Sequence, residues 1–250
     1  MSLAVVTGGS GGIGRAVAAR LLAAGHRVLL TGRKLDALLE AAADLAAVGG
    51  PAVDVAAFDV TDEAAVEHHL APLAVDVLVN NAGYGTSAPL HRVSLAAWEE
   101  MLAVHATGPF LCTRAVLPGM RERDRGRIVM VASVASLVGS PYIAAYTAAK
   151  HAAVGLMRAT AAEVVSSGVT ANAVCPSYVD TPMTDTTVAS ISGRTGRSAE
   201  EARAALERKV PLGRLVTADE VAAAVAYFAS PGAAAVNGQT IVLDGGGIFS

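Results

Sequence analysis

Residues 7–14 read Thr7-Gly8-Gly9-Ser10-Gly11-Gly12-Ile13-Gly14, and this stretch decides the fold of the chain. It follows the apolar run Leu3–Thr7 and precedes apolar residues at helical spacing, so it lies where a strand gives way to a helix. Glycines at 8, 12 and 14 allow a tight turn and a close approach of the backbone to a ligand. The N-terminus of the helix offers unpaired N–H groups and the positive end of a dipole, which together bind a pyrophosphate. A turn that binds no ligand is the alternative interpretation.

Outward from this turn, short apolar runs alternate with longer alanine-rich segments. The runs lack polar alternation, which is typical of strands that are covered on both faces. Strands are expected at Leu3–Thr7, Arg27–Thr31, Val53–Phe58, Val75–Val79, Arg127–Ala132, Val169–Val174 and Thr240–Leu243. Helices are expected at Gly14–Ala24, Leu35–Val48, Glu63–Leu70, Leu95–Met120, Ala144–Ser167 and Ala218–Ala229, with caps at Thr61 and Thr217. This alternation predicts an α/β fold with a parallel, doubly wound sheet.

The composition excludes several classes of protein. The chain has 250 residues, of which 53% are apolar and 16% charged, and its net charge is −3. The high apolar fraction and the small net charge together exclude a disordered chain. Charges or glycines interrupt every long apolar run, so no membrane span is expected, and the charge balance gives no sign of binding to nucleic acid or an anionic membrane. Cys112 and Cys175 are too few for a disulfide framework, and no residues have metal-ligand spacing. We therefore expect that the protein has no metal site and that it resides in a reducing cytoplasm.

One segment breaks the alternation of strands and helices. No linker or internal repeat divides the chain, so residues 1–250 are expected to form a single domain. Met183–Pro211, however, carries arginines, glycines and a Ser-Ala-Glu-Glu helix start without a strand pattern. Ligands of open α/β sheets bind beyond the carboxyl ends of the strands. The insertion at about 183–211 is therefore predicted to form a helical lid over a ligand pocket.

Acid–base chemistry is indicated by a tyrosine and a lysine four residues apart, Tyr146 and Lys150. On a helix the two side chains share one face. A free tyrosine has a pKa near 10, and a neighbouring ammonium lowers that pKa because it favours the phenolate. Only three lysines occur in the chain, and one of them stands here. An exposed Tyr–Lys pair without a function is the alternative.

Two asparagines, Asn80 and Asn81, end an apolar strand and are followed by Ala82 and Gly83. Buried amides at the end of a strand either satisfy backbone groups of the neighbouring strands or line a nucleotide site. The sequence leaves both interpretations open.

Together, these motifs resemble the classical short-chain dehydrogenase/reductase family. Thr-Gly-x₃-Gly-x-Gly, Asn-Asn-Ala-Gly, Ser133 and Tyr-x₃-Lys occur in the family's order, and the resemblance covers essentially the whole chain. It implies a seven-stranded parallel Rossmann sheet of order 3-2-1-4-5-6-7 with three helices on each face. It also implies an NAD(P)-dependent oxidoreductase that acts on C=O or CH–OH groups.

The resemblance also implies roles for single residues. Tyr146 protonates the carbonyl oxygen as hydride arrives, Ser133 hydrogen-bonds that oxygen, and Lys150 lowers the pKa of the tyrosine and holds the ribose hydroxyls. The implied cofactor contacts are Gly8, Ser10, Gly12, Ile13 and Gly14 at the phosphates, Asp59 and Val60 at the adenine, Asn81, Ala82 and Gly83 along the nucleotide, and Pro176, Val179 and Thr181 at the carboxamide.

The choice of cofactor depends on the residues after the second strand, Gly32 and Arg33. An acidic residue there binds a ribose diol and repels a 2′-phosphate, whereas a guanidinium pairs with phosphate. NADPH is therefore favoured over NADH. Gly11 stands against this choice, since many NADP-using members of the family carry a basic residue at that position, and Arg33 as an ordinary solvated side chain is the alternative.

His105 departs from the family pattern, which usually has an asparagine that stabilises a proton-relaying water. A neutral imidazole donates and accepts hydrogen bonds, so it can hold the same water, and it can also titrate near neutral pH. We hypothesise that His105 belongs to the catalytic set and alters the pH profile. A tolerated replacement that bonds to the backbone is the alternative.

The C-terminal third most resembles ketoreductases of 3-oxoacyl thioesters or polyketide chains, through Val210–Arg214 and Asn237–Gln239. The substrate is therefore expected to be a small-molecule ketone, free or tethered to a carrier protein or CoA. Fatty-acid carrier-protein reductases dock their partner through two arginines, and Asp124 and Ser167 stand at those positions here. The lid arginines could attract an acidic carrier instead, or they are ordinary solvated charges: Arg194, Arg197, Arg203 and Arg208.

Two alternatives to an NADPH-dependent ketone reductase remain. One is an NAD-linked dehydrogenase of secondary alcohols or hydroxyacyl-CoA, and the other is a dinucleotide-binding protein without turnover. The segments Leu95–Met120 and Ala144–Ser167 carry more apolar surface than one sheet face consumes. Since these helices form an interface in the family, a homotetramer is expected.

Overall fold

Seven parallel strands form the central sheet. The protein is described by a computed structural model over residues 2–47 and 52–248, and its sheet strands are β1 (Leu3–Thr7), β2 (Arg27–Gly32), β3 (Val53–Ala57), β4 (Val75–Asn80), β5 (Gly126–Val131), β6 (Val169–Pro176) and β9 (Thr240–Leu243). They pair in the order β3-β2-β1-β4-β5-β6-β9, and every pair is parallel. The expected fold class and strand order are confirmed, with β9 as the seventh strand.

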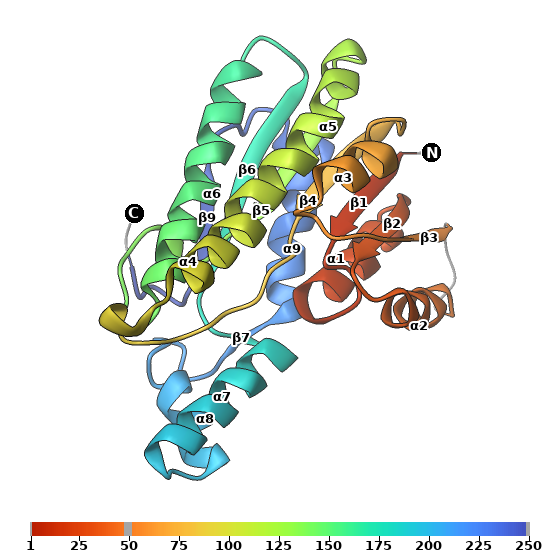
Figure 1. Cartoon of the computed structure of the whole chain (residues 1–250). Coiled ribbons are helices and arrows are strands. Elements are labelled where there is room, and N and C mark those ends of the chain that lie inside the picture. Colours follow the sequence, from red (N-terminus) through yellow and green to blue (C-terminus); the bar gives the residue numbers. More distant parts are fainter. Residues whose placement is uncertain (1, 48–51, 249–250) are drawn as a thin grey trace.

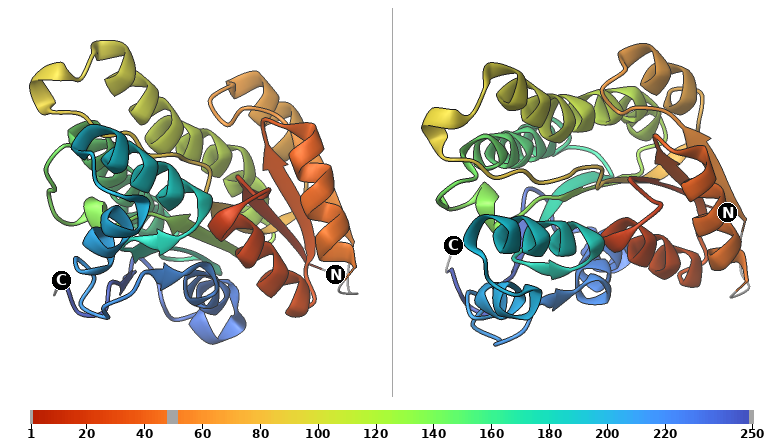
Figure 2. Two further views of the ribbon diagram at one scale, coloured as in Figure 1. Left: turned by 90° about the horizontal axis from the view of Figure 1, so that it is seen from below. Right: turned by 60° about the horizontal axis from the view of Figure 1, so that its bottom comes forward.

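Helices cover both faces of this sheet, as Figures 1 and 2 show. One face packs against α1 (Gly12–Ala23), α2 (Leu35–Ala46) and α9 (Ala218–Ala229), and the other against α3 (Glu63–Leu70), α5 (Gly108–Glu122) and α6 (Ala144–Glu163). Because side chains alternate along a strand, Val5 joins the cluster under α3, α5 and α6, while Val6 joins the cluster under α1, α2 and α9. The expectation of three helices on each face is therefore confirmed.

The predicted helix Leu95–Met120 is wrong as a single helix. It consists of α4 (Leu95–Leu102), a π-helical turn at Ala103–Thr107 and then α5. A π-helical turn inserts an extra residue into the helical ladder, and apolar periodicity does not reveal such an insertion. The expected end of the second helix, Val48, lies outside the described residues.

The two predicted helix caps have different outcomes. Thr217 caps α9 and forms a capping box with Glu220. The expected cap Thr61 is wrong, because Asp62 caps α3 by accepting from the Ala65 N–H. Thr61 instead donates its own N–H and hydroxyl to Asp59.

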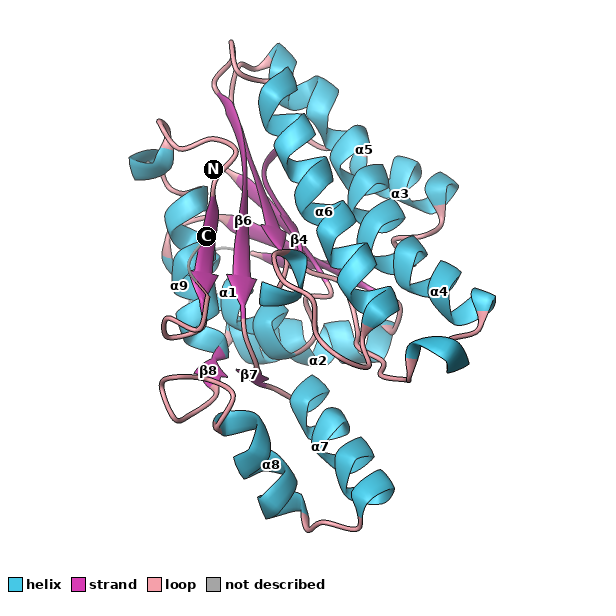
Figure 3. Ribbon diagram, turned by 90° about the vertical axis from the view of Figure 1, so that its left-hand side faces the viewer, coloured by secondary structure: helices cyan, strands magenta, loops and turns pink. Residues whose placement is uncertain are grey.

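The segment predicted as a lid forms a helical hairpin beyond the sheet (Figure 3). Its helices are α7 (Pro182–Thr195) and α8 (Ala199–Glu207), and they share a small apolar cluster of their own. Two short strands that the sequence did not reveal, β7 (Val179–Asp180) and β8 (Val216–Thr217), pair at the base of the hairpin. The hairpin is therefore joined to the sheet domain at both of its ends.

Over residues 2–47 and 52–248, no helix is both long enough and apolar enough to cross a bilayer.

Candidate active site

The three side chains predicted to carry the chemistry meet at the carboxyl end of β5. Ser133 lies two residues beyond this strand, and Tyr146 and Lys150 lie one turn apart in α6. The Lys150 Nζ donates to the Val131 carbonyl at 2.9 Å and lies 5.7 Å from the centre of the Tyr146 ring. The structure thus brings together residues that are separated by up to 17 positions in the sequence.

Burial controls the protonation of this cluster. It raises the pKa of Tyr146 to about 12, while a hydrogen bond with Ser133 acts in the opposite direction. Burial also lowers the pKa of Lys150 to about 8, while an electrostatic interaction with Cys175 acts to raise it. Lys150 is not among the causes of the shift of the tyrosine, and the effect of its charge on the Tyr146 pKa stays a prediction. At neutral pH Tyr146 is a protonated phenol, which is the form that donates a proton.

His105 lies in the π-helical turn, where its side chain is buried. Its Nε2 lies 2.7 Å from the Tyr84 carbonyl oxygen, and because a carbonyl only accepts, we assign the imidazole proton to Nε2. Its ring meets the Tyr146 ring edge to face, with 5.2 Å between the ring centres. Among the described residues, its Nδ1 has no hydrogen-bond partner.

The expectation that His105 titrates near neutral pH is wrong. Burial, followed by the charge of Lys150, lowers the pKa of His105 to about 3. The imidazole therefore stays neutral at neutral pH and contributes through its shape and hydrogen bonds. Its ring also fills the space beside Gly83, where a Cβ would overlap it.

The glycine-rich turn fits a bound dinucleotide phosphate. Gly8 has φ +64°, and a Cβ on Gly14 would overlap the Gly8 carbonyl oxygen, so the turn tolerates no larger residue at these positions. The N-cap of α1 is Gly11, which offers no side-chain cap, so the first N–H groups of this helix remain available to an anion. Of the other predicted contacts, Ser10 and Gly12 lie on this turn, and Ile13 packs partly against the core.

Asn81 secures the glycine-rich turn. Its Nδ2 donates to the carbonyls of Thr7 and Gly8 at 2.9 and 3.2 Å. The backbone N–H groups of Asn81 and Ala82 both donate to the Thr7 hydroxyl at 2.9 Å. The structural interpretation of this amide is therefore correct, and any contact of Asn81, Ala82 or Gly83 with a nucleotide stays a prediction.

Arg33 and Asp59 lie side by side at the ends of neighbouring strands. The Arg33 guanidinium is 4.0 Å from the Asp59 carboxylate, and its side chain is 70% exposed. Val60 differs from the expectation, because its side chain is buried against Gly108 and belongs to the core. Only the backbone of Val60 is therefore suited to an adenine contact.

The residues predicted at the carboxamide occupy the connection from β6 to α7. Pro176 ends β6, and the Thr181 methyl faces the glycine-rich turn, where a Cβ on Gly12 would lie 3.3 Å from it. The Val179 side chain is buried in the core, and its carbonyl accepts from the hydroxyls of Thr181 and Thr184. This connection therefore borders the same turn as the predicted phosphate contacts.

Two residues near the cluster were missed from the sequence. The Tyr84 carbonyl accepts a hydrogen bond from His105. Cys175 is fully buried beside Tyr146 and Lys150. Tyr84 directly follows the Asn-Asn-Ala-Gly motif, and that position was the available signal. Nothing in the sequence marks Cys175, because its place beneath the cluster arises from strand pairing.

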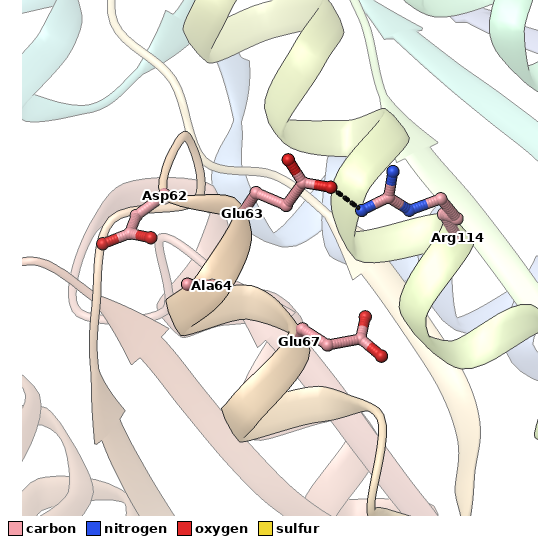
Figure 4. Close-up of a pocket in the computed structure, with 5 residues that line it drawn as sticks. All are labelled: Asp62, Glu63, Ala64, Glu67 and Arg114. Carbon is pink, nitrogen blue, oxygen red and sulfur yellow. Dashed lines mark hydrogen bonds and ion pairs between the residues drawn. The ribbon is translucent and has the colours of Figure 1, made fainter.

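A hollow of about 620 Å³ lies elsewhere, between α3 and α5 (Figure 4). It is bordered by Asp62, Glu63 and Glu67, and Glu63 pairs with Arg114 at 2.5 Å. It shares no lining residue with the Ser133–Tyr146–Lys150 cluster. Among the described residues, no group of three or more His, Cys, Asp or Glu side chains is arranged to hold a metal ion.

The parallel sheet, the glycine-rich turn and the grouping of Ser133, Tyr146 and Lys150 are the features expected of a Rossmann-type oxidoreductase. Residues 2–191 match the family model for short chain dehydrogenase. The chain therefore belongs to the short-chain dehydrogenase family, and it is an oxidoreductase acting on CH–OH and C=O groups. The resemblance inferred from the sequence is confirmed.

Known relatives span almost the whole chain. The sequence is 37% identical over 251 residues to the granaticin polyketide synthase putative ketoacyl reductase 1 of Streptomyces violaceoruber, covering 98% of this chain and 92% of that protein. It is also 37% identical to a D-beta-hydroxybutyrate dehydrogenase of Cupriavidus necator, covering 97% and 96%. The fold matches a crystal structure of an actinorhodin polyketide ketoreductase variant with NADPH at a TM-score of 0.95, with 36% identity and coverage of 99% and 98%.

Proposed function

We propose that this protein reduces a ketone to a secondary alcohol with NADPH, and that its substrate is a 3-oxoacyl thioester or a polyketide-type ketone. One observation carries the proposal: a half-buried, protonated Tyr146 lies beside Ser133 and Lys150, at the carboxyl ends of the strands, where the glycine-rich turn offers an anion site. The similarity to polyketide ketoreductases supports the substrate class. Tethering to a carrier protein or CoA is part of this proposal.

The chain's own residues account for the proton transfer. A bound reduced nicotinamide supplies hydride to the carbonyl carbon. Ser133 holds the carbonyl oxygen by a hydrogen bond, and Tyr146 gives that oxygen its phenolic proton. Lys150 uses one of its three N–H groups on the Val131 carbonyl, which leaves two for the ribose hydroxyls. Its nearby positive charge also stabilises the phenolate that remains.

The preference for NADPH rests on Arg33. Its guanidinium is mostly exposed and sits next to Asp59, which we assign to the adenine. A positive charge beside the proposed adenine contact supports pairing with a 2′-phosphate, and none of the residues 32–34 is acidic. The residues that would hold the cofactor are Gly8, Ser10, Gly12, Ile13, Gly14, Arg33, Asp59, Val60, Asn81, Ala82, Gly83, Tyr146, Lys150, Pro176, Val179 and Thr181.

Carrier docking through the two positions known from fatty-acid reductases is not part of this proposal. Asp124 uses its carboxylate to accept from the Gly168 N–H at 2.6 Å, and Ser167 bonds to the Val164 carbonyl. In the lid, Arg203 pairs with Asp180, Asp185 and Glu207. Arg208, which directly follows α8, is the lid arginine that we assign to an acidic carrier.

We further propose a cytoplasmic homotetramer. Phe110 on α5 is 42% exposed, with the Arg114 guanidinium 5.2 Å from its ring centre. A hollow of about 520 Å³ between α4 and α6 is bordered by Trp98 and His151. Exposed apolar side chains on adjacent helices support burial by another copy of the chain. The two free, buried thiols support a reducing compartment.

The test is NADPH and NADH oxidation with a panel of activated ketones, run on the parent and on Tyr146→Phe. We expect NADPH-dependent turnover, and we expect Tyr146→Phe to lower kcat by about a thousandfold while it still binds NADPH. Unchanged turnover in Tyr146→Phe would refute the proton donor. Preference for NADH would favour the dehydrogenase alternative, and NADPH binding without turnover of any ketone would favour a protein that only binds dinucleotide. Light scattering that finds a monomer at micromolar concentration would overturn the tetramer.

A further inference from the structure

The segment from Tyr84 to Ala88, here called the strap, joins three parts of the molecule that lie far apart in the sequence. It leaves the carboxyl end of β4, and Figure 2 shows this part of the chain running past α7. Its hydrogen bonds connect it to the lid, to the loop before α6 and to the π-helical turn. These contacts give an irregular segment three fixed points.

The outer fixed point is Arg194, in the last turn of α7. Its Nη2 donates to the Ser87 carbonyl at 2.9 Å, and its Nη1 donates to the Ser87 hydroxyl at 3.2 Å. Arg203, by contrast, pairs with three carboxylates that belong to the base and the helices of the lid. Among the ion pairs of residues 2–47 and 52–248, Arg194 has no acidic partner. Its guanidinium therefore serves to tie the lid to the strap.

The inner fixed points lie beside the catalytic tyrosine. The Ala88 N–H donates to the Tyr142 carbonyl at 2.7 Å, four residues before Tyr146. Tyr142 has φ +69°, a conformation that costs a non-glycine residue energy and persists only where the surroundings hold it. At the other end of the strap, the Tyr84 carbonyl accepts from His105, whose ring packs against Tyr146.

From these contacts we infer that Arg194 is a positioning residue, which sets how a ketone with a long substituent is held over Tyr146. By fixing Ser87, Arg194 orders the strap. In this inference a long substituent of the ketone lies against the strap, beside the exposed Tyr142 side chain. A short ketone does not extend so far. We therefore expect the strap to matter for ketones that extend on one side, such as 3-oxoacyl thioesters. The inference deepens the proposed reductase function and rests on it.

Arg194→Met tests this with two substrates of different length. We expect the KM of the N-acetylcysteamine thioester of 3-oxooctanoic acid to rise about fivefold, because two charge-assisted hydrogen bonds are lost. The KM of ethyl acetoacetate and the dissociation constant of NADPH should change by less than about twofold. Arg197→Met is the matched control and should change none of these values, since Arg197 makes no side-chain hydrogen bond among the described residues. Equal changes of KM for both ketones, or no change for either, would overturn the inference.

Hydrogen exchange of the unliganded protein separates this inference from the proposed function. In Arg194→Met the Ala88 amide and its neighbours in the strap should exchange faster, while amides of α9 keep the parent rate. Arg197→Met should match the parent throughout. If the parent reduces no ketone, the proposed function fails, and the exchange comparison still decides whether Arg194 holds the strap. If the exchange rate of the Ala88 amide is the same in Arg194→Met as in the parent, the inference is wrong, whatever substrate the enzyme reduces.

Discussion

The sheet domain and the lid are held together in different ways. In the sheet domain, apolar side chains fill two large clusters on both faces of seven strands. The predicted catalytic residues lie beyond β5, in α6 and, for His105, in the π-helical turn. The lid has a cluster of four buried residues, Val188, Ala202, Leu206 and Leu215, and its other ties are exposed ion pairs and two-residue strands. The predicted catalytic residues thus lie on the extensively packed part of the molecule, whereas the predicted lid has a small core, so we expect it to open locally at a lower free-energy cost.

Core substitutions, one in the sheet domain and one in the lid, should show this difference most clearly. Phe228→Ala in α9 removes a fully buried ring and should lower the free energy of unfolding by about 3–5 kcal/mol. Leu206→Ala in the lid should lower the free energy of global unfolding by less than about 1.5 kcal/mol, because the lid can open locally before the rest of the protein unfolds. Urea unfolding measures the global value, and limited proteolysis detects local opening, which should rise only for Leu206→Ala. Equal global losses would mean that lid and sheet unfold as one unit.

Two glycines sharpen the same comparison. In Gly14→Ala the new Cβ overlaps the Gly8 carbonyl, so the phosphate turn must shift, and the affinity for NADPH should fall at least about tenfold. Gly193→Ala in the lid places its Cβ in open space and should leave that affinity unchanged. Fluorescence titration with NADPH measures both variants. An unaltered dissociation constant for Gly14→Ala would argue against this turn as the phosphate site.

The next smaller effect concerns cofactor choice. Arg33→Ala removes the exposed guanidinium beside Asp59 and should weaken NADPH binding about tenfold, while NADH binding stays the same. Arg15→Ala is a control on α1, since Arg15 is an exposed arginine that pairs with Asp44. Titration with both dinucleotides gives the ratio of their dissociation constants for each variant. A parallel loss for NADPH and NADH would show that Arg33 does not read the 2′-phosphate.

The smallest effect is on the pH profile. The pKa of Lys150 is lowered from 10.5 to about 8, so its ammonium is lost as pH rises through about 8, and kcat/KM should fall there by about half. The unfolded chain still binds this proton up to about 10.5, so the same group makes stability rise between these two pH values. His105→Asn should leave the basic limb in place, because the imidazole is already neutral. A limb that moves with His105→Asn would contradict this assignment.

The sequence predicted the sheet well because its strands are mainly apolar and lack polar alternation, as in Leu3–Thr7, which indicates a core on both faces. It also named Ser133, Tyr146 and Lys150, since Tyr-x₃-Lys places two of them on one helical face. It failed where tertiary contacts decide. The π-helical turn at His105 and the raised pKa of Tyr146 both depend on what packs around a residue. Local pattern carries no information about those neighbours.

The close approach of Gly83 and His105 makes these two positions interdependent. An imidazole at 105 admits only a hydrogen where the side chain of residue 83 would begin. A methyl group at 83 would therefore become acceptable only alongside a shorter side chain at 105. Any redesign of this enzyme has to treat the two as a compensating pair, and a single exchange at either position reports on both.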